Sequence, residues 1–299
     1  MPIFFIISGY FFTFKHQETL PFKIYFVKKI KTLLIPYIII GLLLYYPLYI
    51  VNHDVTPALY IKQVFFYNDN TEQMVSAFWF LTALFIANIL YYLLVKYLQT
   101  KTRVSIIICL STLAIFNGNI SLIHLPFSAN AGIIGLVFCL IGSFIRNSEI
   151  KKRYINYLFN LNIFVTIILT FLVIKLIKYN ILVDMKNSCG NFLLFYLNVI
   201  LSYIIIINYS KYILNFLNIT KLSLLLNWLL HIGKNSIFFV CFNFPIIIYF
   251  KFEKLLSLNC LIAFKFLSVI IIITVLSLII NKTKLRFIVG KTKNLHIFN

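Results

Sequence analysis

Long apolar stretches that are almost free of charged side chains recur along the whole 299-residue chain. A helix needs about 20 such residues to cross the hydrocarbon core of a membrane. Nine stretches qualify as candidates: 2–14, 33–51, 75–95, 104–123, 126–145, 154–174, 187–210, 230–250 and 260–281. Backbone polar groups in lipid must pair within their own segment, so the sequence predicts an all-α, polytopic integral membrane bundle of about nine transmembrane helices. The first stretch is too short to span comfortably.

Composition excludes an ordinary soluble protein. Hydrophobic residues make up 62% of the chain and charged residues 11%, whereas soluble domains carry about 25% charged residues. The net charge of +20 would suit a nucleic-acid-binding protein, but the basic residues lie between apolar runs rather than on one face. We therefore expect membrane lipid, and no nucleic acid, as a partner.

Loop charges predict the orientation of the chain in the membrane. Most of the 27 basic residues fall in five segments, 15–31, 96–103, 146–153, 211–221 and 282–299. Basic loops remain on the cytoplasmic side, so these five segments, including the C-terminus, are expected to be cytoplasmic. Alternation then places residue 1 outside without a signal segment before it. A missing upstream helix would resolve that arrangement.

Several classes of chemistry are disfavoured. The sequence has no P-loop, HExxH or GxSxG motif. ATP-driven pumps, zinc peptidases and ordinary serine hydrolases are therefore excluded as protein classes. All seven acidic residues lie in loops or at helix ends, which disfavours a proton-coupled carrier. We expect no metal and no bound cofactor.

A basic cluster precedes the second apolar stretch. Lys28, Lys29 and Lys31 lie in the sequence VKKIKTLLIPY (27–37), and the α-helical spacing places Lys28 and Lys31 on one face. Three ammonium groups at the cytoplasmic mouth of a bundle could bind phosphates. They could equally anchor the helix to anionic lipid, each contributing about 1 kcal/mol.

Two further patterns involve polar and small residues. Trp228, His231, Lys234 and Asn235 recur at three- and four-residue steps, which places them on one helical stripe. This stripe is either an amphipathic turn at the membrane interface or a polar surface that faces a substrate. The small pair in SGY (8–10) would let another helix approach closely, and Trp79 fits an aromatic belt.

The motifs, taken in order, resemble those of the acyltransferase 3 family, bacterial membrane-bound O-acyltransferases that acetylate sugars. The closest likeness is to its fucose-4-O-acetylase-like branch. The matching elements are MPIFFIISGYFF (1–12), VKKIKTLLIPY (27–37), FWFLTALFIANIL (78–90), LPFSANAGIIGLVFCLIGSFI (125–145), GNFLLFYLNVILS (190–202) and HIGKNSIFFVCFNFP (231–245). Together they cover essentially the whole chain, which we treat as one membrane-embedded domain, residues 1–299.

The resemblance implies ten helices, with a catalytic histidine on a first helix that would lie upstream of Met1, so the chain is expected to be N-terminally truncated. That histidine would take the proton from the acceptor hydroxyl as the hydroxyl attacks the acyl-CoA thioester. Asn243 stands where the family usually has histidine, and an amide cannot shuttle a proton near pH 7.

Two functional hypotheses of different classes follow. In the first, the chain belongs to an acyltransferase of the bacterial inner membrane, with acyl-CoA as donor substrate and a carbohydrate or lipid-linked glycan of capsule, exopolysaccharide or lipopolysaccharide as acceptor. Lys28, Lys29 and Lys31 would then bind acyl-CoA, and Trp79, His231, Asn235 and Asn243 would face substrate. In the second, the chain is an inactive relative, or a membrane protein that translocates glycans or other solutes.

Overall fold

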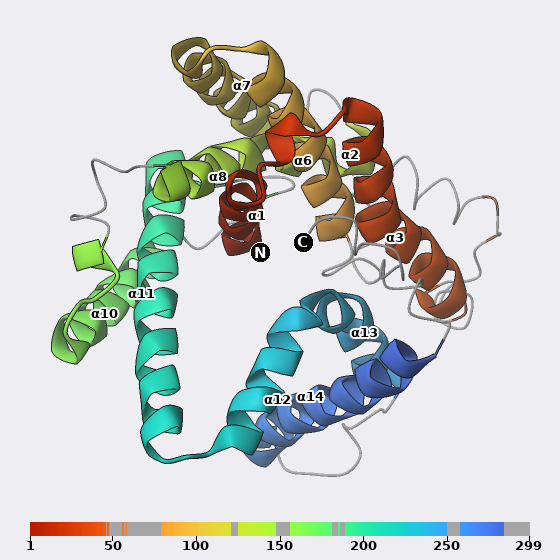
Figure 1. Ribbon diagram of the computed structural model, residues 1–299, viewed down its shortest axis with the longest axis vertical. Helices are drawn as coiled ribbons and strands as arrows, with labels where there is room; N and C mark the ends of the chain where they lie inside the picture. Colours follow the sequence, from red (N-terminus) through yellow and green to blue (C-terminus); the bar gives the residue numbers. More distant parts are fainter. Residues whose placement is uncertain are drawn as a thin grey trace. The chain divides into compact units, whose positions relative to one another are not determined.

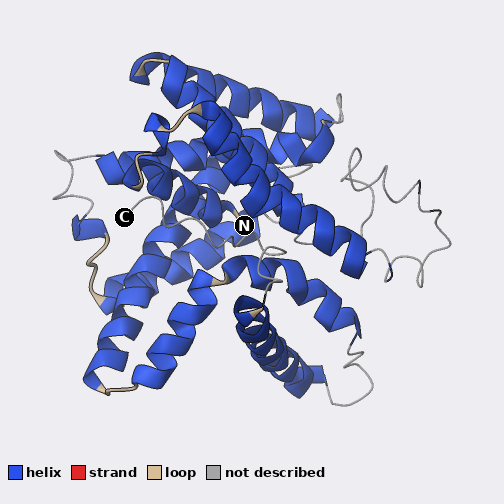
Figure 2. Ribbon diagram, turned by 45° about the vertical axis from the view of Figure 1, so that its right-hand side comes forward, coloured by secondary structure: helices blue, strands red, loops and turns tan. Residues whose placement is uncertain are grey.

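The structure is a computed structural model, and it describes residues 1–45, 47, 56, 58, 79–120, 125–147, 156–180, 185, 189–249 and 258–283. Within these ranges every regular element is helical and no strand occurs (Figure 2). The α-helices are α1 (Pro2–Phe14), α2 (Phe22–Lys29), α3 (Ile35–Ile40), α6 (Trp79–Tyr97), α7 (Thr100–Ile120), α8 (Ala129–Asn147), α10 (Ile163–Tyr179), α11 (Phe192–Ile219), α12 (Ser223–Lys234), α13 (Ser236–Tyr249) and α14 (Leu258–Lys282). The shorter helical turns are η1 (Gln17–Thr19), η2 (Ile30–Leu34), η3 (Gly41–Tyr45) and η5 (Pro126–Ser128).

The predicted all-α membrane fold is confirmed. In the described residues four segments are long and apolar enough to cross a membrane: α6, the beginning of α7, the run from η5 through α8, and α11. Helix α12 and the first part of α13 form a fifth candidate that is bent by 69°. The predicted stretch 33–51, the tail 282–299 that is predicted to be cytoplasmic, and part of the loop 146–153 extend into residues outside the described ranges.

Helix α10, which is shorter than these candidate spans, exposes many apolar side chains. On α10 only Thr166 and Val173 are buried, while Phe164 and Phe171 leave about 70% of their surface exposed (71% and 69%). A helix that is apolar on all sides is stable in a membrane or deep in a protein core. We conclude that α10 presents most of its surface to lipid.

The chain folds as two compact units. Unit 1 comprises Met1–Pro21 and Ile86–Leu226, and unit 2 comprises Phe22–Phe85 and Asn227–Asn299. Each unit therefore combines segments that lie far apart in the sequence.

Helices α1 and α8 form the core of unit 1 (Figure 1). Gly9 on α1 lies so close to α8 that a Cβ atom there would overlap the carbonyl of Cys139, and a Cβ on Gly142 would overlap the carbonyl of Ile6. Glycine at both positions brings the two backbones into contact. The predicted role of the small pair in residues 8–10 as a helix-approach site is therefore confirmed.

Helix α10 begins later than the apolar run 154–174 suggested. The side chain of Asn208 on α11 accepts a hydrogen bond from Leu161 N (2.9 Å) and donates one to the carbonyl of Leu158 (2.9 Å). Asn162 then caps α10 by accepting a bond from Phe164 N (3.3 Å). These bonds satisfy backbone groups that continuing the helix would otherwise pair, so the run divides at residues 159–162.

In unit 2, α13 contacts both α3 and α14. The apolar core between α13 and α14 consists of Phe238, Ile246, Val269 and Ile273. Pro245 lies inside α13, where it removes one backbone donor from the helix.

Candidate functional site

All seven residues that the sequence suggested as site residues belong to unit 2. They come from two distant stretches of the chain, one ending with Trp79 and the other beginning with His231. Five of them form two clusters, a basic one on the α2–η2 segment and a polar one where α12, α13 and α14 meet; Trp79 and Asn243 lie apart from both.

The basic cluster lies where an α-helix changes into a π-helix. Helix α2 ends at Lys29, and η2 follows at Ile30–Leu34 with π-helical hydrogen bonding. Because a π-helix winds more residues into each turn, Lys31 is rotated relative to Lys28 from the position that a continuous α-helix would give it. The predicted placement of Lys28 and Lys31 on one face assumed a continuous α-helix, and the structure has a π-helix from Ile30 instead. Single π turns in α-helices are frequent at functional sites.

Local contacts position the backbone and one ammonium group of this cluster. The hydroxyl of Thr32 donates to the carbonyl of Lys28 (3.0 Å). The Nζ atom of Lys29 lies 5.2 Å from the ring centroid of the fully buried Tyr25, a cation–π distance. Lys31 is exposed. The segment therefore presents positive charge at its surface, and the buried Tyr25 anchors its other side.

The polar cluster joins the end of α12 to α14. His231 Nε2 lies 2.7 Å from Ser277 Oγ, and Asn281 Nδ2 donates to Asn235 Oδ1 (3.0 Å). Asn235, at the break between α12 and α13, is buried, as is Ser277. Two pairs four residues apart, His231 with Asn235 and Ser277 with Asn281, therefore face each other. The predicted stripe faces a matching polar stripe on α14 at these two positions.

Two hydrogen-bond arrangements are available to neutral His231. In the first, Ser277 Oγ donates to the carbonyl of Thr274 (2.8 Å), so that His231 Nε2–H donates to Ser277 and Nδ1 carries the lone pair. In the second, the Ser277 hydroxyl turns toward Nε2, and Asn235 Nδ2 (3.2 Å) also faces it as a donor. Because a partner fixes the histidine tautomer, this cluster can hold neutral imidazole with an accepting nitrogen.

The remaining two candidates lie apart from these contacts. Trp79 begins α6 and is buried, with its ring centroid 6.4 Å from that of Phe80. Asn243 lies on α13 with its side chain exposed. Neither makes a described hydrogen bond to the two clusters.

Three residues of the two clusters, Tyr25, Ser277 and Asn281, are not indicated as site residues by the sequence pattern. A usable signal existed for the last two, because polar residues four apart in the apolar stretch 260–281 repeat the spacing of His231 and Asn235. Tyr25 gave no such signal. In the described ranges, no group of three or more histidine, cysteine, aspartate or glutamate side chains is arranged to hold a metal ion.

The fold and the two clusters define the class: a polytopic helical membrane protein with a basic and a histidine-containing cluster in one unit. A family model described as an acyltransferase domain matches residues 1–282. The chain therefore belongs to the acyltransferase 3 family, and acyltransferase activity is the general function that this membership supports. No curated protein and no solved structure matches the chain.

Proposed function

We propose that this protein transfers an acyl group from acyl-CoA to a hydroxyl of a carbohydrate or lipid-linked glycan at the bacterial inner membrane, with its C-terminus in the cytoplasm. The acceptor oxygen forms a bond to the thioester carbonyl carbon, the carbon–sulfur bond breaks, and the hydroxyl proton ends on the CoA thiol. The observation that carries this proposal is the family match over residues 1–282, which leaves donor and acceptor to be assigned from the residues.

The basic cluster of Lys28, Lys29 and Lys31 supports acyl-CoA as the donor. CoA carries several phosphate charges and no positive group to balance them, so ammonium groups gathered on one segment complement it. The π turn and the contact between Lys29 and the Tyr25 ring place that charge on an ordered segment.

The polar cluster supports a hydroxyl-bearing acceptor. His231 supplies an imidazole that can form a hydrogen bond with a hydroxyl group. Asn243 has an exposed side chain and supplies an amide of the kind with which proteins commonly bind sugars, while the buried Asn235 and Trp79 would position the acceptor side from within. We assign these four residues to the acceptor side of the proposed reaction.

The experiment compares two thioester donors. Lys28→Gln/Lys31→Gln in the purified protein is expected to weaken acetyl-CoA binding by about tenfold or more, since bonds to charged groups each contribute about 1.5–3 kcal/mol. Binding of acetyl-pantetheine, which lacks the nucleotide phosphates, should not change. Lys175→Gln/Lys178→Gln, which removes two exposed lysines of α10, is the matched control.

If Lys28→Gln/Lys31→Gln binds acetyl-CoA as well as the parent protein does, the basic cluster anchors the helix to anionic lipid and does not bind the donor. Acceptor assignment is tested in membranes by following labelled acetyl transfer to the lipid-linked glycan fraction, where no transfer would contradict the proposed function.

A further inference from the structure

The end of unit 1 where α1, α6 and α8 terminate is built from exposed cations and aromatic rings. The guanidinium carbon of Arg146, at the end of α8, lies 4.6 Å from the ring centroid of Phe14 at the end of α1. On α6, Lys96 Nζ lies 3.0 Å from the hydroxyl of Tyr92, which donates to the carbonyl of Leu20. These contacts place the three helix ends side by side.

A third cation extends this surface. Lys15 directly follows α1, and its Nζ lies 5.7 Å from the ring centroid of Phe11. Lys15, Lys96 and Arg146 are all exposed. In the ranges that the structure describes, none of the three pairs with a carboxylate. Aromatic faces hold these cations without neutralising them, so their charge is available to a ligand.

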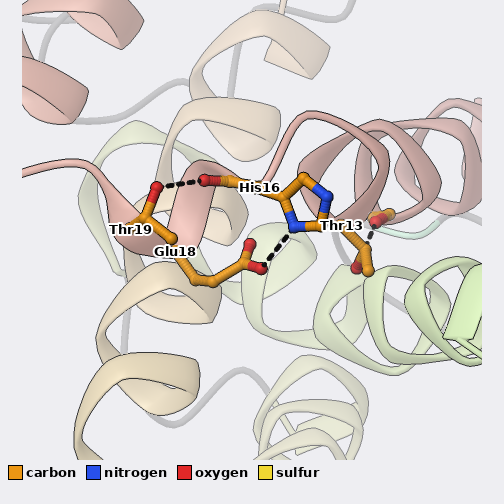
Figure 3. A network of polar contacts seen from close by, with 5 residues as sticks. Thr13, His16, Glu18 and Thr19 are labelled. Atoms are coloured by element: carbon orange, nitrogen blue, oxygen red, sulfur yellow. Dashed lines mark hydrogen bonds and ion pairs between the residues drawn. The ribbon is translucent and has the colours of Figure 1, made fainter.

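The turn after α1 is fixed by its own contacts (Figure 3). The hydroxyl of Thr19 donates to the carbonyl of His16 (2.8 Å), and Glu18 Oε1 lies 3.5 Å from His16 Nδ1. Gln17 Oε1 and the second oxygen of Glu18 are buried without a hydrogen-bond partner among the described residues. Gln17 itself is 7% exposed. Both oxygens face the interior of the turn, so what the turn presents to a ligand is its exposed cation, Lys15.

We infer that this end of unit 1 binds the headgroup of an anionic phospholipid. The headgroup phosphate matches the three exposed cations Lys15, Lys96 and Arg146. Phe11 and Phe14, each nearly half exposed (45% and 46%), supply the apolar surface against which the glycerol and acyl chains pack. A soluble phosphate compound would leave these rings uncovered, so a lipid is the occupant that fits both features.

The test uses the purified full chain in detergent with phosphatidylglycerol and phosphatidylcholine as probes, and native mass spectrometry counts the bound lipids. Lys15→Gln/Lys96→Gln/Arg146→Gln is expected to lower the apparent affinity for phosphatidylglycerol about tenfold or more, because each basic group near an anionic lipid surface contributes substantially to binding. Phosphatidylcholine binding should remain weak and unchanged. The control Lys175→Gln/Lys178→Gln/Lys221→Gln removes three exposed lysines of the same unit.

A charge-keeping variant, Lys15→Arg/Lys96→Arg/Arg146→Lys, separates binding from folding and should bind phosphatidylglycerol like the parent. Equal loss in the triple-Gln variant and its control would overturn the inference. Displacement of the bound phosphatidylglycerol by stoichiometric acetyl-CoA would also overturn it, because the phosphate site would then belong to a soluble donor. Unchanged acetyl-CoA binding in Lys28→Gln/Lys31→Gln would contradict the proposed donor site but would not affect this inference about lipid binding.

Discussion

Ser277 is the residue on which the polar cluster of unit 2 depends. Ser277→Ala removes the group 2.7 Å from His231 Nε2 inside an apolar helix interface, and an unsatisfied buried partner costs about 1–3 kcal/mol. We expect Ser277→Ala to lower the thermal unfolding temperature in detergent and Ser277→Thr to preserve most of it. Ser210→Ala is the control, because that exposed hydroxyl bonds only to its own helix.

A double-mutant cycle shows whether the two side chains act together. Once His231→Ala is present, Ser277→Ala should cost much less than it does alone, because residues that share a hydrogen bond show non-additive effects. Additive losses in the unfolding free energy would mean that the 2.7 Å contact contributes nothing.

Also at the residue scale, the sequence pattern predicted that His231 and Asn235 share one helical stripe, but it did not predict their partners on α14. The spacing of His231 and Asn235 is a local property of the helix, and the structure retains it. Their partners on α14 lie 46 residues away, and that pairing depends on how the bend at Asn235 directs α12. The winding at Lys31 was not predictable either, since a π turn depends on how the segment before Pro36 packs.

At the scale of elements, the contact between α1 and α8 gives the sharpest prediction. Gly9→Ala and Gly142→Ala each place a methyl group where the partner backbone already lies, and overpacking of this kind costs typically 1–3 kcal/mol, occasionally more. We expect both variants to lower the unfolding temperature strongly, or to prevent purification of monodisperse protein.

Gly233 supplies the matched control for the glycine variants. A Cβ there meets no atom within 4 Å, and alanine is the better helix former by about 1 kcal/mol. Gly233→Ala should therefore be neutral or slightly stabilising. A loss equal to that of Gly9→Ala would show that the effect is not one of helix contact.

Hydrophobic runs located the long helices but not their ends. The stretches 75–95, 104–123, 126–145 and 187–210 all lie largely within observed helices, because about 20 uncharged residues leave few alternatives in lipid. Helix ends depend on side-chain caps such as Asn162, and on partners such as Asn208, which reaches the chain from another helix. A hydropathy pattern contains no information on which asparagine performs this role.

At the scale of the whole molecule, helix ends within unit 1 agree with the loop charges that predicted orientation. The ends of α1, α6 and α8 meet through Arg146, Phe14 and Tyr92, and the segments 15–31, 96–103 and 146–153 that follow them are those the positive-inside rule assigned to one side. The grouping of these helix ends therefore agrees with the prediction that the three loops share one side of the membrane.

That orientation can be measured with cysteine labelling in a background whose five native cysteines are replaced by alanine. Gln99→Cys, between α6 and α7, should be protected from a membrane-impermeant maleimide in intact cells and labelled after the membrane is opened. Tyr179→Cys, at the far end of α10 and 72% exposed, should be labelled in both cases, because loop 175–186 is predicted to be outside. Labelling of Gln99→Cys in intact cells would reverse the orientation, and with it the access of acyl-CoA from the cytoplasm to Lys28 and Lys31.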